Sequence, residues 1–195
     1  STHPGEEAIV VQTHLILRAR FPRLLTIIAP RHPVRGAGIA EIAAGGGLTS
    51  ALRSLGELPD NDTDIYIADT VGELGLLYRL APIVFIGGSL VRHGGQNPIE
   101  AAKLGAVVAH GPHVGNFREI YQALDEEHGA AQIADAPSLA KRVAGWLADP
   151  ESRAIAADAA RVTVEQQSGA LERTLAALEP YLMQLRLGGR SGHHA

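Results

Sequence analysis

The chain has 195 residues, of which 46% are hydrophobic and 19% are charged, a size and balance that fit one soluble domain with a sizeable core. Its formal net charge is −4 and no Lys/Arg run is long enough to follow a phosphate backbone, which disfavours nucleic acid as a partner. It contains no cysteine, so disulfides and zinc–cysteine sites are excluded. Its apolar runs fall far short of the about 20 residues needed to span a bilayer, so we expect no membrane span.

The amino-terminal residues read as a loop that leads into a helix. Ser1 and Thr2 precede Pro4 and the acidic pair Glu6 and Glu7, a pattern typical of a helix start. No signal-peptide pattern precedes them. Because a strand should lead into such a loop, we expect that this strand is missing and that the chain is a fragment.

Strands and helices are predicted to alternate along the first two thirds of the chain. Short continuous apolar runs indicate strands buried on both faces, and apolar spacings of three and four indicate helices. In chain order we expect a helix over 6–20, a strand over 24–29, a helix over 36–44, strands over 48–53 and 64–68, a helix over 72–78, a strand over 83–86, a helix over 98–104, a strand over 106–109, a helix over 116–124 and a strand over 130–133. Only helices are expected after residue 135, over 137–148, 151–167 and 169–185, the last bent at Pro180, and then a flexible tail over 188–195.

This alternation predicts an α/β fold with a doubly wound, parallel, Rossmann-like sheet and extra carboxyl-terminal helices. Right-handed crossovers place the carboxyl end of every strand on the same edge of such a sheet, and ligands bind at that edge. We therefore expect residues 1–187 to form one ligand-binding domain whose site lies in the loops that follow the strands.

The clearest candidate site is the helix start Gly94-Gly95-Gln96-Asn97-Pro98-Ile99-Glu100. Asn97 suits the N-cap and Pro98 suits the first helical position. In one interpretation, Glu100 only closes a capping box with the Asn97 amide. In the other, the glycines let a phosphate approach the N–H groups of the helix start, and Glu100 binds a vicinal diol such as a ribose. The glycines favour the second interpretation.

Three further loops follow predicted strands and would meet at the same edge. Gly87-Gly88-Ser89 either turns backbone N–H groups toward a ligand or simply forms a turn. Arg31-His32 offers a guanidinium either for phosphate oxygens or for a surface salt bridge. The segment 69–73 is either an ordinary helix start or part of a nucleotide pocket. Their shared edge favours a common site.

Several other chemistries are disfavoured. The nine histidines form no metal-ligand motif, so we expect no metal site. The G-x-S-x-G, Walker A and G-x-G-x-x-G patterns do not occur, which disfavours hydrolase, P-loop and standard dinucleotide functions. No cofactor is indicated.

Together these motifs resemble the carboxyl-terminal domain of the bacterial 3-deoxy-D-manno-octulosonic acid (Kdo) transferases of lipid A assembly. Gln96 stands where many members have His, and Val71 where many have Met, which alters the pocket without removing its backbone donors. The segments that carry the resemblance, in the family's order and approximate spacing, are Ser1-Thr2-His3-Pro4-Gly5-Glu6-Glu7, Pro30-Arg31-His32-Pro33, Asp69-Thr70-Val71-Gly72-Glu73-Leu74-Gly75, Gly87-Gly88-Ser89-Leu90, Gly94-Gly95-Gln96-Asn97-Pro98-Ile99-Glu100 and Gly111-Pro112-His113.

The resemblance implies a two-domain GT-B glycosyltransferase, in which the amino-terminal half holds the acceptor and the carboxyl-terminal half, present here, holds CMP-Kdo. It implies transfer of Kdo with inversion to a lipid A precursor hydroxyl. The general base would lie in the missing half, so no catalytic residue is predicted here. Arg31, Asn97 and Glu100 are implied to hold the CMP part, with the glycine-rich loops near its phosphate. The predicted donor-binding residues are Arg31, His32, Gly72, Glu73, Gly87, Gly88, Ser89, Gly95, Gln96, Asn97 and Glu100.

Two alternatives stay open: a GT-B domain that uses a UDP-sugar, and a nucleotide-binding module without activity of its own. The resemblance also implies that the parent protein works at the cytoplasmic face of the bacterial inner membrane. We expect this fragment to be soluble and inactive alone.

Overall fold

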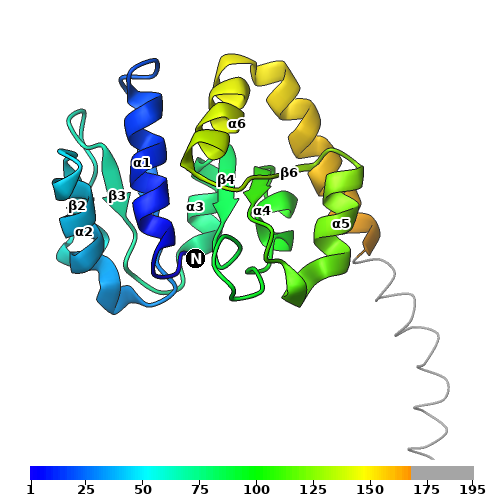
Figure 1. The fold of residues 1–195 in the computed structure, drawn as a ribbon, viewed down its shortest axis with the longest axis horizontal. Helices are drawn as coiled ribbons and strands as arrows, with labels where there is room; N and C mark the ends of the chain where they lie inside the picture. The colour runs from blue at the N-terminus through cyan, green and yellow to red at the C-terminus, as the bar shows by residue number, and fades with distance from the viewer. Residues whose placement is uncertain (168–195) are drawn as a thin grey trace, which may run out of the picture.

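The structure, a computed structural model, describes residues 1–167, in which strands and helices alternate (Figure 1). The predicted helix over 169–185, its bend at Pro180 and the tail over 188–195 lie outside the described residues. The strands are β1 (Thr26–Ile28), β2 (Ser50–Leu52), β3 (Ile65–Ile67), β4 (Ile83–Ile86), β5 (Val107–His110) and β6 (Ala130–Gln132). The helices are α1 (Glu6–Arg18), α2 (Gly36–Gly45), α3 (Leu74–Leu80), α4 (Ile99–Lys103), α5 (Arg118–Glu126) and α6 (Ala136–Ala148), with 3-10 turns η1 (Pro33–Arg35), η2 (Arg53–Leu55) and η3 (Gly115–Phe117). Residues 150–167 are also helical.

The strands form two parallel halves. The first half has the strand order β1-β3-β2 and the second β4-β5-β6. In Figure 1 the first half lies on the left, the second half lies on the right, and α1 lies between them. All pairings are parallel, so the strands of each half end at a common edge. The predicted parallel α/β fold is confirmed.

Each half has its own apolar core. Ile65 and Ile67 of β3 are fully buried, as are Val107 and Val108 of β5. Such continuous apolar strands require cover on both faces, which helices provide in parallel α/β folds. Helix α1 packs against α2 of the first half and against α6 of the second. This helix therefore joins the two cores.

Some predicted bounds differ where backbone conformation decides them. Helix α3 begins at Leu74 and not at residue 72, because Gly72 has a left-handed backbone (φ 92°) that a right-handed helix excludes. Helix α5 begins at Arg118 and not at residue 116, because a 3-10 turn precedes it. The strand β1 is shorter than its apolar run, since Leu24 and Leu25 lie outside the ladder with β3.

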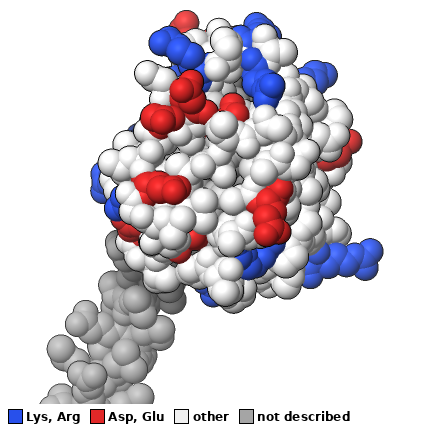
Figure 2. All heavy atoms as spheres, turned by 90° about the vertical axis from the view of Figure 1, so that its left-hand side faces the viewer, with Lys and Arg blue, Asp and Glu red and all other residues white. Residues whose placement is uncertain are grey.

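Charge is spread over the surface. Figure 2 shows acidic and basic side chains interspersed among neutral ones on the face that lies at the left of Figure 1. A nucleic-acid-binding face would gather Lys and Arg into one patch or stripe, which this face does not do. None of the described helices is long and apolar enough to cross a bilayer.

Candidate functional site

The first residues of the chain lie beside the carboxyl end of β1. The Thr2 N–H donates to the Ala29 carbonyl at 3.0 Å, and the Arg31 N–H donates to the Thr2 carbonyl at 2.9 Å. Thr2 thus forms a parallel bridge with Pro30. This bridge brings the amino-terminal loop next to the predicted ligand-binding loop at Arg31, whose side chain is exposed.

Glu6, at the start of α1, anchors the loop after β4. Its side chain is fully buried, and its carboxylate accepts the N–H groups of Gly88 (2.8 Å), Ser89 (3.1 Å) and Leu90 (3.0 Å). It also accepts the His3 N–H at 2.9 Å. Consecutive amides converging on one carboxylate form the kind of concavity that binds anions. Of the two interpretations of Gly87-Gly88-Ser89, these contacts favour the simple turn, because Glu6 occupies the amides of Gly88 and Ser89.

Gly87 and Gly88 are still needed as glycines in the tightly packed loop between β4 and α4. A Cβ at Gly87 would lie 1.9 Å from the Ser1 carbonyl oxygen, so no side chain fits. The carbonyls of Gly87 and Gly88 accept the N–H groups of Gln96 (3.0 Å) and Gly95 (2.8 Å). Those two amides are thus also satisfied inside the protein, and the predicted phosphate donors must lie further along the chain.

Such donors lie at the start of α4. The Asn97 Oδ1 accepts the Ile99 N–H at 2.9 Å, which caps the helix start. No hydrogen bond among residues 1–167 uses the amides of Asn97, Glu100 or Ala101. The capping box between Glu100 and the Asn97 amide, one of the two interpretations, is not formed, and the Glu100 side chain is exposed. The helix start therefore offers backbone donors and an accessible carboxylate side by side.

A group of histidines lies between the β1 loop and this helix start. The rings of His3 and His93 stack with centroids 4.1 Å apart, and the His3 Nε2 lies 3.0 Å from the Gln96 Nε2. Burial lowers the pKa of His3, and the nearby His93 and His32 rings lower it further. His3, His93 and Gln96 thus lie together at one corner. Residues 1–167 contain no group of three or more His, Asp or Glu side chains that could hold a metal ion.

The loop after β3 uses its acidic groups internally. The Glu73 carboxylate accepts from the Arg53 guanidinium at 2.7 and 3.1 Å and also from the Thr70 hydroxyl. Hydrogen bonds from Arg53, and then from Thr70, lower the pKa of Glu73 to about 2. Gly72 is exposed at the turn before it. The start of α3 nevertheless borders the site, because a Cβ at Gly75 would lie 3.1 Å from the Glu100 Oε1.

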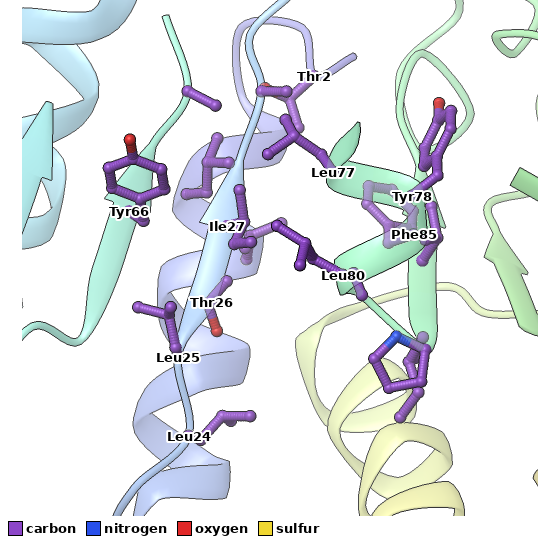
Figure 3. Close-up of a pocket in the computed structure, with 18 of the residues that line it drawn as sticks. Thr2, Leu24, Leu25, Thr26, Ile27, Tyr66, Leu77, Tyr78, Leu80 and Phe85 are labelled. Carbon is purple, nitrogen blue, oxygen red and sulfur yellow. The ribbon is translucent and has the colours of Figure 1, made fainter. Parts of the chain in front are cut away.

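A large cavity lies elsewhere (Figure 3). It measures about 630 Å³ and separates β1 from β4. Of the predicted donor-binding residues only Glu73 lines it. Its walls are mostly apolar, which does not suit a nucleotide phosphate. The loops at the strand ends, and not this cavity, are the candidate nucleotide site.

No family model matches the chain. A 3-deoxy-D-manno-octulosonic acid transferase from Haemophilus influenzae is 38% identical to it over 183 residues, which are 93% of the chain and 43% of that protein. The solved carboxyl-terminal CMP-Kdo binding domain of WaaA from Acinetobacter baumannii is similar with a TM-score of 0.80 and 31% identity, covering 84% of the chain and 86% of that domain. The chain belongs to the Kdo transferase family.

The family predicted from the sequence is thereby confirmed. A second solved structure, the carboxyl-terminal domain of the group 1 glycosyl transferase LpcC from Francisella tularensis, shares the fold, with a TM-score of 0.60 at 13% identity over 83% of the chain and 78% of that domain. The chain spans less than half the length of the curated Kdo transferases that it matches, 43% of the Haemophilus influenzae protein and 44% of one from Bordetella pertussis.

Sequence reasoning missed the residues that hold the site loops in place. The sequence pattern assigns Glu6 and Glu7 to a first helical turn, yet both are fully buried. Glu6 binds the loop after β4, and Glu7 accepts both terminal nitrogens of Arg35 at 2.6 and 2.9 Å. Two adjacent acids directly before the apolar run 8–11 were the available signal, but their partners lie far away in the sequence.

Proposed function

We propose that this chain binds the nucleotide of a CMP-Kdo donor at the start of α4, as the donor-binding part of a Kdo transferase. The observation that carries the proposal is the pairing of two amides without protein partners among residues 1–167, those of Asn97 and Glu100, with an exposed Glu100 carboxylate. A phosphate accepts hydrogen bonds from converging backbone amides at a helix start. A carboxylate accepts hydrogen bonds from the two hydroxyls of a ribose.

The surrounding residues fit this division of roles. Arg31 is exposed at the end of β1, where its planar fork can bind a phosphate or a base edge. His32 follows Arg31 in the same loop, and Gln96 lies 3.0 Å from the His3 ring. Gly95 is left-handed (φ 76°), and a Cβ there would lie 3.2 Å from the Val114 Cα, so the turn before the helix depends on glycine. Gly72 and Glu73 would lie at the rim of the nucleotide site. The Glu73 carboxylate is already bound by Arg53 there and is not free for the nucleotide.

The proposed reaction of the full-length protein is transfer of Kdo from CMP-Kdo to a hydroxyl of a lipid A precursor, with inversion. The residues of this chain would act on the leaving group: amides at the start of α4 and the Arg31 guanidinium stabilise the negative charge that grows on the CMP phosphate. The general base and the acceptor contacts would come from the remainder of the protein. With a lipid A precursor as acceptor, the full-length enzyme would work at the cytoplasmic face of the inner membrane.

Calorimetric titration with CMP and with UDP tests donor binding. We expect CMP to bind, and Glu100→Ala and Arg31→Ala each to weaken it by about tenfold, the loss of about one charge-assisted hydrogen bond. Asn97→Ala keeps its backbone amide but loses the cap that holds the start of α4, and should weaken CMP binding through that loss. Glu41→Ala removes an equally exposed acid on α2 and should leave binding unchanged. Tighter binding of UDP would favour a UDP-sugar donor instead. CMP binding that survives all three site substitutions would place the nucleotide elsewhere.

Activity is tested separately. The chain alone should not transfer Kdo from CMP-Kdo to a lipid A precursor, whereas the full-length protein should. Turnover by the chain alone would refute the assignment of the general base to the remainder of the protein. Nucleotide binding without turnover in the full-length protein would identify a binding module and not a transferase.

A further inference from the structure

Two histidine rings lie against each other beside the start of α4. The rings of His3 and His93 stack with their centroids 4.1 Å apart and an angle of 24° between their planes. His3 comes from the loop before α1, and His93 comes from the loop between β4 and α4. The stacked pair therefore joins two loops that are far apart in the sequence.

The contact with Gln96 fixes the position of the proton on the His3 ring. The Gln96 side-chain nitrogen lies 3.0 Å from the His3 Nε2, and because an amide nitrogen only donates, Nε2 is the acceptor. A neutral imidazole then carries its hydrogen on Nδ1. Burial, followed by the effect of the His93 ring, lowers the pKa of His3, which favours this neutral form. His3 thus has one N–H donor on its ring, at Nδ1.

The Nδ1 donor of His3 has no acceptor among residues 1–167. The hydrogen bonds of this residue there use only its backbone groups and its Nε2. Its Cδ2 and Nε2 edge packs toward Gly88, where a Cβ would lie 3.3 and 3.4 Å from these two atoms. The residue is only 8% exposed, yet its Nδ1 is not among the fully buried polar atoms that lack a partner. A mostly buried donor that stays accessible suits an acceptor from a ligand.

The His93 ring is held in place without the use of its nitrogens. Its backbone N–H donates to the Val91 carbonyl at 2.7 Å, and its carbonyl accepts from the Asn116 side-chain nitrogen at 3.0 Å. Neither ring nitrogen forms a hydrogen bond within residues 1–167, and the side chain is exposed. A histidine ring has one N–H donor when neutral and two when protonated. The pair therefore offers at least one donor from each ring.

The surroundings of the pair suit an anion. Of the charged groups that influence the pKa of His3, Glu6 is the only acid. The Glu6 carboxylate already accepts four backbone N–H groups, including that of His3. The other side chains that act on His3 are the rings of His93 and His32. An incoming carboxylate would thus meet N–H donors beside an acid whose charge is already compensated.

The proposed donor sugar carries a carboxylate close to its phosphate. Kdo is an octulosonic acid, so its anomeric carbon bears a carboxylate as well as the oxygen that links it to the phosphate of CMP. The carboxylate must therefore lie directly beside the bound phosphate. Gln96 contacts His3 and directly precedes Asn97, whose amide is proposed to bind that phosphate. The histidine pair thus adjoins the place that the carboxylate would occupy.

We propose that His3 and His93 form a subsite for the carboxylate of the donor sugar, and so select nucleotide sugars whose anomeric carbon bears a carboxylate. This inference rests on the proposed binding of the nucleotide at the start of α4. The His3 Nδ1–H and a ring N–H of His93 donate to the carboxylate oxygens. A neutral sugar has no anion for these donors and loses the corresponding hydrogen bonds.

Two cytidine 5′-phosphodiesters that differ only in a carboxylate test the proposal. One is the methyl ester. The other is the carboxymethyl ester, in which the carbon that bears the phosphate oxygen also bears a carboxylate, as in the proposed donor. Both have the same phosphodiester charge and neither has sugar hydroxyls beyond those of the ribose. In calorimetric titration of the chain, we expect the carboxymethyl ester to bind at least about tenfold more tightly, because hydrogen bonds to a charged group are strong.

Variants of His93 locate the source of this preference. His93→Phe keeps an aromatic ring to stack on His3 but has no N–H donor, so the preference should fall to about twofold or less. His93→Arg supplies stacking and donors again and should restore it. His128→Asn changes an exposed histidine on another loop and should keep the parental preference. In nitrogen-15 NMR, the His3 Nδ1 resonance should shift with the carboxymethyl ester and not with the methyl ester.

The outcomes separate this subsite from the nucleotide site. If neither ester binds, the proposed nucleotide site is wrong and the subsite falls with it. Equal affinities for the two esters, or a preference that survives in His93→Phe, would overturn the subsite alone and leave the nucleotide site in place. A His3 Nδ1 resonance that responds alike to both esters would refute the role of His3.

Discussion

Glu6 and Gly88 are 82 positions apart in the sequence, and the Glu6 Oε2 accepts the Gly88 N–H at 2.8 Å. The same carboxylate accepts the amides of Ser89 and Leu90, so the first turn of α1 fixes the loop that follows β4. Because α1 packs on both halves of the fold, this contact ties the second half to the first at the edge where the nucleotide is proposed to bind. The buried Glu6 carboxylate thus shapes the loop beside the proposed phosphate-binding site.

Replacing Glu6 with glutamine should destabilise the protein. The amide keeps the volume of the side chain but replaces one acceptor oxygen with an NH₂ group that faces N–H donors. Hydrogen bonds to a charged acceptor contribute about 1.5–3 kcal/mol, so we expect Glu6→Gln to lower the free energy of unfolding by about 3 kcal/mol. Urea unfolding measures the change.

The control is Glu41→Gln, which changes an exposed acid on α2 and should alter stability by less than about 0.5 kcal/mol. CMP affinity of Glu6→Gln should also fall, since the loop before α4 loses its anchor. A variant as stable as the parent would show that the buried carboxylate is not what holds the loop.

The sequence predicted the alternation of elements and the family because both are encoded locally. Short segments rich in β-branched and aromatic residues, such as 64–68 and 83–86, favour buried strands, and the motif 94–100 places a cap, a proline and an acid within four positions. Element bounds were less accurate, since they depend on single backbone angles such as that of Gly72.

Long-range partners could not be predicted. Nothing near Glu73 in the sequence indicates that Arg53, 20 positions away, binds its carboxylate at 2.7 Å. Nor does the loop at Gly88 carry a sign that Glu6 occupies its amides. Polar pairs of this kind arise from the packing of distant elements. One sequence therefore gives the residue types of a site, but not which of them are already hydrogen-bonded within the protein.

Two glycines of helix α2 should respond oppositely to alanine. A Cβ at Gly36 would lie 2.1 Å from the Asp69 Oδ2 and 2.9 Å from its Cβ, and Asp69 is held by the Ser54 N–H (2.8 Å) and hydroxyl (2.6 Å). Gly36→Ala should therefore cost about 1–3 kcal/mol of unfolding free energy through overpacking. A Cβ at Gly38 would meet nothing within 4 Å, and the backbone there is ordinary helix, so Gly38→Ala should stabilise by up to about 1 kcal/mol.

Thermal unfolding of both variants checks this pair. The two substitutions are identical in chemistry and lie in one helix, so helix propensity alone would raise stability in both. A rise in both would contradict the close contact between Gly36 and Asp69.

The buried ion pair of Glu7 and Arg35 should show strong coupling. The Arg35 fork bonds both carboxylate oxygens at 2.6 and 2.9 Å, and the Glu7 side chain is 0% exposed. Arg35→Ala leaves a buried carboxylate without its cation and should cost about 3–5 kcal/mol. Adding Glu7→Gln removes that charge, so the double variant should be less destabilised than the sum of the two single variants. A double-mutant cycle by urea unfolding measures the difference, and additive effects would refute the coupling.

His14 should make stability fall as the pH drops. Its side chain is 1% exposed, its Nδ1 lies 2.8 Å from the Thr26 hydroxyl, and its Nε2 lies 3.4 Å from the Asp64 carboxylate without forming a hydrogen bond. Burial lowers the pKa of His14 below its ordinary value of 6.5, and this outweighs the opposing effect of Asp64. The unfolded chain therefore binds a proton at this site at a higher pH than the folded protein does.

Stability contributed by the neutral His14 is complete above the ordinary pKa and is lost as the pH falls below it toward the folded pKa. His14→Gln cannot titrate, so its unfolding free energy should decline less between about pH 7.5 and about pH 5.5 than that of the parent, even if it is lower at the upper pH. His3 has a lowered pKa too and contributes a decline of the same sign to both proteins, so the difference between their slopes isolates His14. The control is His128→Asn, at an exposed position with φ 59°, which asparagine tolerates, and it should keep the parental slope. Equal slopes for His14→Gln and the parent would show that His14 titrates alike in the folded and unfolded states.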